Sequence, residues 1–294
     1  MDITGQTFIR GNQLDSGRFL VSTQDPGLDI ETQPHQGLCY WTDDDGWAEI
    51  GLAAKITVDA AVSEDGLRML TMDASGFLHE TDGDETDKDF LKDADGKIPS
   101  APFRCIRRVG SQLFAAGVER QVQRRDGGDW QIVSAENDAD KPCAFQGIDG
   151  FGPEEIYAAG WDGEIWAFDG ATWVQRDSPS SIVLNDICAG PDACVAVGLA
   201  GEVVVGRHND WALVKHDETS EPFWSVRAFQ GAFYLSALSG IYRLEDGVLS
   251  LFRETDEDMR TAYALSVGPS GLWSVGAHDI VLFDGEGWRT IAQA

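Results

Sequence analysis

The segment that decides the fold reads Ile156-Tyr-Ala-Ala-Gly160-Trp-Asp-Gly163-Glu-Ile-Trp-Ala-Phe-Asp169-Gly170-Ala-Thr-Trp173. Four further segments resemble it: Leu113–Trp130, Cys194–Trp211, Phe233–Leu249 and Leu272–Trp288. The shared positions are a glycine and a closing apolar residue, namely Gly117, Gly160, Gly198 and Gly276, and Trp130, Trp173, Trp211, Leu249 and Trp288. These positions recur at intervals of roughly forty residues, which is the length of one four-stranded structural repeat.

The residues of the repeat favour short strands with tight turns. The expected strands are Ile156–Gly160, Glu164–Phe168, Trp173–Arg176 and, beyond a loop, Ile182–Cys188. Glu164–Phe168 partly alternates polar and apolar residues, as a half-buried strand does. Asp169-Gly170 predicts a type I′ hairpin turn, because Gly readily adopts the positive φ that this turn needs and Asp tolerates it. Four-stranded antiparallel units repeated around an axis form a β-propeller.

The first half of the chain follows the same spacing in weaker copies. Trp47 follows Asp45-Gly46, and Phe90 lies about midway between Trp47 and Trp130. The closing residues then number seven: Trp47, Phe90, Trp130, Trp173, Trp211, Leu249 and Trp288. We therefore predict an all-β fold, a single seven-bladed propeller domain over residues 1–294, with six blades as the alternative if residues 1–50 form another structure. We expect Gln6–Arg10 to pair with the last blade as an extra strand, because ring closure removes exposed sheet edges.

The charge balance restricts the classes of partner. The 294 residues include 50 acidic and 22 basic side chains, which give a net charge of −28 at pH 7. Such a surface repels phosphate, so we expect no nucleic-acid partner. It attracts a basic protein and accelerates the encounter with it. The alternative is that the acidity only maintains solubility or reflects a salt-rich host, since only six of the basic residues are lysines.

The sequence also indicates the compartment. The apolar runs are far shorter than the ~20 residues of a membrane span, and residues 1–25 lack the apolar stretch of a secretory signal. The cysteines are scattered and odd in number: Cys39, Cys105, Cys143, Cys188 and Cys194. This pattern is typical of buried, reduced thiols rather than of a disulfide framework. We therefore expect a cytoplasmic protein that does not bind membranes.

The run Ile-Tyr-Ala-Ala-Gly-x-x-Gly-x-Ile-x-x-Phe-Asp-Gly-x-x-Trp at 156–173 resembles bacterial propellers of the WD-repeat and sialidase-repeat-like superfamily. The resemblance is clear over residues 103–294 and weak over 1–102. Similar cytosolic propellers are often encoded beside polymorphic toxins of contact-dependent or type VI systems, where they look like immunity proteins. The resemblance therefore implies a bacterial immunity protein, or antitoxin, whose partner is a toxin domain.

Propeller geometry places many acidic residues on one face. Loops from the outermost strand of a blade to the innermost strand of the next lie on the same face as the loops between second and third strands. A ring of carboxylates around a few aromatic side chains is typical of a protein-binding surface. The candidate partner-binding residues are Asp93, Asp95, Glu136, Asp138, Asp140, Trp161, Asp162, Asp217, Glu218, Glu221, Trp224, Glu254, Asp256, Glu257 and Asp258. The alternatives are that Asp simply favours turns, and that Trp161 packs between blades.

No motif for catalysis, a cofactor or a metal stands out. The five histidines lack metal-ligand spacing, and no Cys-x-x-Cys pair, phosphate loop or nucleophile elbow occurs. Sialidase chemistry would need arginines clustered at the axis, whereas the pairs Arg107-Arg108 and Arg124-Arg125 fall within one blade. We therefore predict a non-catalytic toxin inhibitor, monomeric before binding, that covers a basic toxin domain. The alternatives are a glycosidase or lectin that uses the central funnel, and a general intracellular scaffold.

Overall fold

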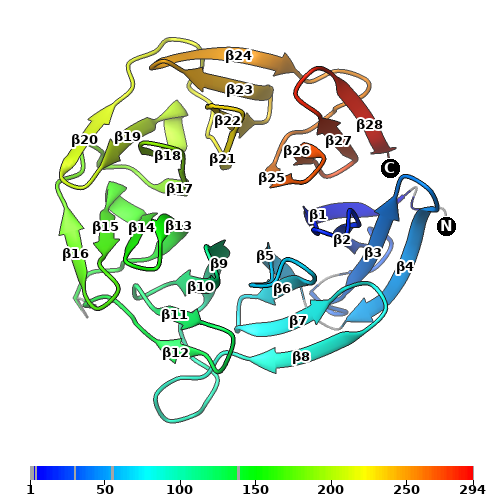
Figure 1. The fold of residues 1–294 in the computed structure, drawn as a ribbon, viewed down its shortest axis with the longest axis horizontal. Coiled ribbons are helices and arrows are strands. Elements are labelled where there is room, and N and C mark those ends of the chain that lie inside the picture. Colours follow the sequence, from blue (N-terminus) through cyan, green and yellow to red (C-terminus); the bar gives the residue numbers. More distant parts are fainter. Residues whose placement is uncertain (1–2, 4, 30, 54–55, 138–139, 294) are drawn as a thin grey trace.

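The computed structural model describes residues 3, 5–29, 31–53, 56–137 and 140–293. They form seven four-stranded antiparallel sheets, and each sheet is a meander of consecutive strands. The sheets stand as blades around a central axis, with the chain running once around the ring (Figure 1). The prediction of a seven-bladed all-β propeller is confirmed, and residues 1–50 contribute to the first blade rather than to a different structure.

Each blade is one contiguous segment of the chain, with its first strand innermost (Figure 1). The innermost strands are β1 (Thr7–Gln13), β5 (Thr57–Val62), β9 (Phe103–Val109), β13 (Phe145–Gly152), β17 (Leu184–Ala189), β21 (Ser225–Phe229) and β25 (Ala264–Gly268). The second strands are β2 (Phe19–Gln24), β6 (Met69–Asp73), β10 (Gln112–Gly117), β14 (Glu155–Gly160), β18 (Cys194–Gly198), β22 (Ala232–Ala237) and β26 (Gly271–Val275).

The outer half of each blade completes the meander. The third strands are β3 (Gln36–Thr42), β7 (Phe77–Thr81), β11 (Val122–Arg125), β15 (Ile165–Phe168), β19 (Val203–Arg207), β23 (Gly240–Glu245) and β27 (Asp279–Phe283). The outermost strands are β4 (Gly46–Ala53), β8 (Thr86–Phe90), β12 (Gln131–Ile132), β16 (Trp173–Arg176), β20 (Asp210–Leu213), β24 (Val248–Glu254) and β28 (Trp288–Gln293). Two short 3₁₀ turns, η1 (Trp161–Gly163) and η2 (Leu199–Gly201), join second to third strands. Within the described part of the chain, no helix is long and apolar enough to cross a membrane.

The meander gives the ring two different faces. Loops between second and third strands, and loops between consecutive blades, leave from the same end of every sheet; we call this end the connection face. The remaining hairpin turns lie at the opposite end, which we call the hairpin face. The assignment follows from the antiparallel strand order, which is the same in all seven blades.

The repeated glycine has a steric cause at the connection face. At Gly160 a Cβ atom would overlap the carbonyl oxygen of Ala144, in the loop that enters the same blade. A Cβ atom at Gly117 would overlap the carbonyl oxygen of Pro102, and one at Gly198 would overlap that of Val183. The next amide after Gly160, that of Trp161, donates a hydrogen bond to Ala144 O at 3.0 Å. The glycine is therefore required by a close backbone approach that fixes each connection onto its blade.

The hydrophobic core is divided among the spaces between blades. Seven clusters of buried residues can be distinguished in the described chain, and each draws on two adjacent blades. In the cluster between the first and last blades, Phe19 stacks on Trp273 with ring centroids 4.0 Å apart. All five cysteines are buried and free, as expected from their scattered positions. Every blade is thus stabilised by its two neighbours.

Ring closure differs from the expectation. Residues 7–10 belong to β1, the innermost strand of the first blade, and pair with β2. The prediction that Gln6–Arg10 adds a strand to the last blade is therefore wrong. The two blades meet instead through Gln13, whose Oε1 accepts hydrogen bonds from Trp273 Nε1 at 3.1 Å and Ser270 N at 2.8 Å. Gln13 Nε2 donates to Ser270 Oγ at 2.8 Å, and Phe8 N donates to Ala277 O at 3.0 Å.

Two local predictions also need correction. The turn at Asp169-Gly170 exists, but only Gly170 has positive φ, so it is not of type I′. The Asp169 carboxylate instead accepts hydrogen bonds from the amides of Ala171 and Thr172. Phe90 pairs with Phe77 at the start of the third strand, whereas Trp173 pairs with Phe168 at its end. Phe90 therefore marks the right blade without being the structural equivalent of Trp173.

Candidate protein-binding face and axial cavity

The sequence-predicted acidic residues lie at the connection face. Asp93 and Asp95 fall between the second and third blades, Glu136 and Asp140 between the third and fourth, and Asp162 within η1. Three further groups complete the set: Asp217, Glu218 and Glu221 before β21, Glu254 as the last residue of β24, and Asp256, Glu257 and Asp258 before β25. Asp138 lies outside the described residues. Asp162 is paired within the protein, because Lys141 Nζ contacts Asp162 Oδ2 at 3.0 Å.

Several of these carboxylates hold their own loops. Asp93 Oδ1 accepts hydrogen bonds from the amides of Asp95 and Lys97. Glu221 Oε2 accepts one from Ser239 N at 3.0 Å. Asp256 accepts amide hydrogen bonds from Met259 and Asp258, which lower its pKa. Their first role is therefore structural. The exposed candidates whose carboxylates are not occupied by a described contact are Glu136, Asp217, Glu218, Glu254, Glu257 and Asp258.

Acidity alone does not distinguish the two faces. The hairpin face carries its own acidic turns, at 43–45, 82–85 and 284–286. Many of those carboxylates are paired: Asp84 with Arg18 at 2.8 Å, Asp43 with Arg289 at 2.6 Å, and Glu85 with Arg68 at 3.4 Å. The connection face must therefore be distinguished by something other than its charge.

Two matching loops present large apolar side chains on the connection face. The first residue of η1 and η2, Trp161 or Leu199, follows the repeated glycine. Its amide donates a hydrogen bond to a carbonyl oxygen, of Ala144 or Val183, in the loop that enters the same blade. The second residue adopts the left-handed region, with φ of 55° at Asp162 and 56° at Ala200. Because the backbones match, Trp161 and Leu199 occupy equivalent places on neighbouring blades. Trp161 is half-buried and Leu199 is 37% exposed.

Three further side chains extend this apolar surface over the following blades. Trp224 and Tyr263 directly precede β21 and β25, with ring centroids 5.4 Å apart. Leu238, between β22 and β23, is 56% exposed. We call Trp161, Leu199, Trp224, Leu238 and Tyr263 the apolar arc; it spans the fourth to seventh blades beside the exposed carboxylates. An apolar, partly aromatic centre bordered by charge is the usual composition of a protein-binding surface.

The sequence reasoning found Trp161 and Trp224 but missed Leu199, Leu238 and Tyr263. Two signals were available. Leu199 aligns with Trp161 in the repeat, and Tyr263 stands just before an innermost strand, as Trp224 does. By contrast, Asp93 and Asp95 lie on the other side of the ring, between the second and third blades, and do not border the apolar arc.

A buried ion pair supports the loops beneath Trp161. Arg120 Nη2 contacts Glu164 Oε2 at 2.7 Å, and Arg120 Nε contacts the same oxygen at 2.9 Å. Trp166 Nε1 also donates to Glu164, and the guanidinium of Arg120 lies 4.8 Å from the centroid of the Trp166 ring. Both charged residues are over nine-tenths buried. Bidentate geometry of this kind fixes the third blade against the fourth.

The axis holds a cavity of about 470 Å³ whose mouth is a ring of seven side chains, one from each blade. The ring comprises Ile9, Val58, Arg104, Gln146, Asn185, Trp224 and Tyr263. In the first five blades this residue sits at a register shift between the first two strands. In the last two it immediately precedes the innermost strand. The extra residue of a bulge re-aims a side chain, here into the axial opening.

Arginines gather in this cavity although they are distant in sequence. Arg10, Arg104, Arg107 and Arg227 line it, together with Asp59 and Asp186. Burial opposes ionisation of Asp186, but the guanidiniums of Arg227 and Arg107 outweigh it and lower the pKa of that carboxyl. The inference that arginines would not cluster at the axis is therefore wrong, because the first, third and sixth blades all contribute. No group of three potential ligand side chains suited to a metal ion was found in the described chain.

The fold and the connection face define a seven-bladed propeller with a composite apolar and acidic surface. Over 224 residues the chain is 36% identical to the immune protein Tsi7 of Pseudomonas aeruginosa, which covers 74% of this chain and 71% of that protein. The chain therefore belongs to the family of this immune protein. No family model matches the sequence.

Solved propellers support the same fold without indicating a function. A catalytically inactive virginiamycin B lyase from Staphylococcus aureus, crystallised with quinupristin, is similar with a TM-score of 0.72 and 10% identity, covering 94% of both chains. The WD40 propeller domain of Doa1 gives a TM-score of 0.71 at 9% identity, over 96% of this chain and 90% of that one. The WD40 repeats of RRP9 give 0.66 at 12% identity, over 92% and 88%.

Proposed function

We propose that this protein is a cytoplasmic immunity protein that binds a bacterial toxin domain through its connection face and blocks it without catalysis. Membership in the family of an immune protein is the observation that carries the proposal. The apolar arc beside exposed carboxylates supports the choice of face, since it combines anchors with charge. A basic toxin domain is the partner that this charge favours, and a monomer is the form that binds it.

Inhibition in this proposal is steric. The ring is rigid, because each blade packs on two neighbours through a buried cluster. A rigid surface loses little conformational entropy on docking, which favours tight binding. The apolar arc provides the affinity, while exposed acidic side chains such as Asp217 and Glu257 accelerate association and set the orientation. Each exposed ion pair adds only about 0.2–1 kcal/mol.

The test compares two leucines on opposite faces. The partner is a toxin domain from the same bacterium that co-purifies with the wild-type protein, and binding is measured by surface plasmon resonance. Leu238→Asp alters the apolar arc, and Leu67→Asp is the matched control, because Leu67 is 52% exposed on the hairpin face against 56% for Leu238. We expect Leu238→Asp to weaken binding by at least about tenfold, since a charge then opposes the desolvated centre of the interface. Equal affinities of the two variants would refute the proposed face.

The same assay tests the role of charge. Association should slow several-fold between about 0.05 and 0.5 M salt, because the Debye length falls from over 10 Å to about 4 Å. An association rate that salt leaves unchanged would show that the acidic residues do not guide the partner.

A further inference from the structure

The charge of the axial cavity is opposite in sign to the net charge of the molecule. The chain carries a net charge of −28, whereas the cavity lining contains four arginines and two aspartates. Its mouth is at the connection face, because Trp224 and Tyr263 stand in the loops of that face. Guanidinium groups that are partly withdrawn from water need nearby negative charge to offset their desolvation.

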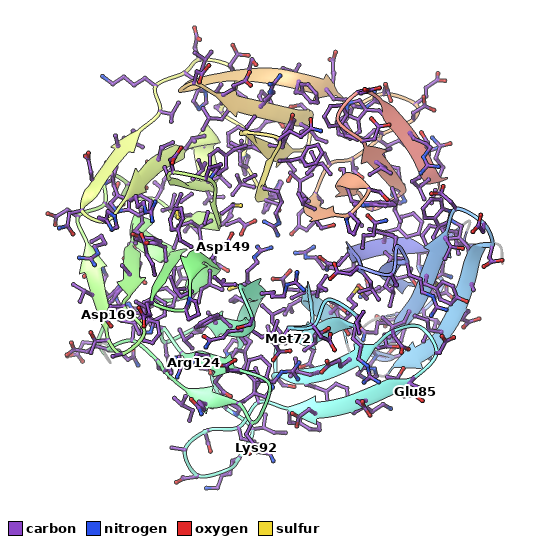
Figure 2. All side chains as sticks on the ribbon, in the orientation of Figure 1. Met72, Glu85, Lys92, Arg124, Asp149 and Asp169 are labelled. Atoms are coloured by element: carbon purple, nitrogen blue, oxygen red, sulfur yellow. The ribbon has the colours of Figure 1, made fainter. Side chains whose placement is uncertain are left out.

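The ion pairs within the cavity leave positive charge uncompensated. The carboxylate of Asp186 forms two ion pairs, with Arg107 Nη2 at 3.2 Å and with Arg227 Nη1 at 2.6 Å. One negative charge is therefore shared by two guanidinium groups. Arg10 contacts Asp59 at 3.4 Å. Arg104, at the mouth, has no carboxylate partner among the described residues and is exposed. Asp149 stands on the neighbouring inner strand near the axis (Figure 2), where burial raises the pKa of its carboxyl while the guanidiniums of Arg107 and Arg227 act in the opposite direction.

The lining also contains polar groups that the protein leaves unused. Trp224 Nε1 and Ser266 Oγ are buried and have no hydrogen-bond partner in the described chain. Both residues line the cavity, together with the amide side chain of Gln146. Both atoms are closed off from the open space of the cavity, so the polar side chains that the lining offers to a ligand are Arg104 and Gln146. On the far side from Arg104, Trp224 and Tyr263 supply an aromatic wall.

We propose that the axial cavity is an oxyanion-binding site for a single carboxylate or phosphate group. Arg104 would hold the oxyanion through its planar, forked N–H groups, which match the geometry of carboxylate and phosphate. The positive charge available to a ligand is centred on Arg104, because Asp149 and Asp59 lie near Arg107 in addition to Asp186. The oxyanion comes either from a free small acid or from an acidic side chain in a flexible peptide. The site does not depend on the proposed immunity function.

The experiment measures binding of defined probes to the full chain by isothermal titration calorimetry at low salt. The probes are inorganic phosphate, citrate and the capped peptide acetyl-Gly-Glu-Gly-amide, with the Gln peptide of the same length as the neutral control. The variants are Arg104→Ala and Arg124→Ala. Arg124 is a matched control, since it lies in the third strand of the same blade, away from the axis (Figure 2), and bonds only Gln131 among the contacts described.

We expect at least one anionic probe to bind, and Arg104→Ala to weaken it about tenfold, because a charge-assisted hydrogen bond is lost. Arg124→Ala should change the affinity less than twofold, although it removes the same net charge. If only phosphate or citrate binds, the ligand is a free small acid. If the Glu peptide binds and the Gln peptide does not, the ligand is a carboxylate side chain of a peptide. Absence of binding by every anionic probe at about 20 mM, or equal effects of the two variants, would overturn the site. Arg104→Lys keeps the positive charge but lacks the planar guanidinium group. Its affinity for the probe should therefore lie between those of the wild type and Arg104→Ala.

Discussion

At the scale of single residues, Arg120 occupies a position that the repeat reserves for glycine. Gly163 and Gly201 hold the equivalent places with φ of 70° and 73°, and Arg120 adopts φ of 52° there. A bulky residue in the left-handed region costs on the order of 1 kcal/mol. The buried ion pair with Glu164 offsets this cost and explains why an arginine is tolerated.

This arrangement predicts a large effect of Glu164→Gln. The substitution keeps the shape of the side chain but removes the charge of Glu164 from the buried guanidinium of Arg120, so we expect the free energy of unfolding to fall by about 3 kcal/mol. Urea denaturation measures it. Glu154→Gln, at an exposed turn of the same blade, is the control and should change stability by less than about 0.5 kcal/mol. A loss below about 1 kcal/mol for Glu164→Gln would mean that the pair is not a main support of this interface.

At the scale of elements, η1 and η2 show how one backbone carries different chemistry. The two turns share their hydrogen bonds and φ values, but they present Trp161 and Leu199. The middle residue needs φ near +55°, which Asp tolerates better than Ala does. Ala200 is therefore a strained residue in an exposed turn.

The strain at Ala200 predicts that the same substitution has opposite signs at two sites. Ala200→Gly removes the steric penalty of the left-handed conformation, and we expect it to raise the free energy of unfolding by about 0.5 kcal/mol. Ala212→Gly, in the exposed strand β20, should lower it by about 0.5–1 kcal/mol because glycine loses more entropy on folding. Thermal unfolding of both variants measures the difference. Destabilisation by Ala200→Gly would contradict the strain argument.

The fold could be predicted because its steric requirements repeat in the sequence. The glycine at Gly160 recurs in four blades and the tryptophan at Trp173 in five, because these blades repeat a close backbone approach and the packing of an outer strand. The site was only partly predictable. Loop positions identified the connection face, but not which carboxylates bind their own loops, as Asp93 and Asp256 do. Arg10 and Arg227 meet at the axis because ring geometry relates them, and no local pattern signals that.

The start of the chain shows a different limit of prediction. The repeat period fixes the length of a blade but not the strand at which the chain enters the ring. The sequence therefore predicts a strand at Gln6–Arg10 but assigns it to the wrong blade, since residues 7–10 belong to β1 and pair with β2. Only the pairing of β1 with β2 decides the matter, and that pairing depends on the whole ring.

At the scale of the whole molecule, no strand of the described chain is shared between the first and last blades, so closure rests on side-chain contacts and on the hydrogen bond from Phe8 N to Ala277 O. Gln13→Leu would leave the buried Trp273 Nε1 without its hydrogen-bond partner and remove the acceptor of Ser270 N, and we expect a loss of about 1–3 kcal/mol in the free energy of unfolding. Hydrogen–deuterium exchange should accelerate mainly in β1 and β25–β28. The control is Gln112→Leu, since Gln112 is also buried but bonds only Asp126 of its own blade. Uniform acceleration over all blades would argue against a weak seam.

The contiguity of the blades has an evolutionary consequence. Where a closing strand is shared, gaining or losing a blade disrupts two sheets at once. Here every sheet is encoded by one uninterrupted stretch, and the amino and carboxyl ends lie beside each other (Figure 1). A gene segment can therefore be duplicated, exchanged or moved from one end to the other while each sheet stays intact. Such modular recombination lets relatives replace the loops of individual blades and acquire new binding specificities on an unchanged frame.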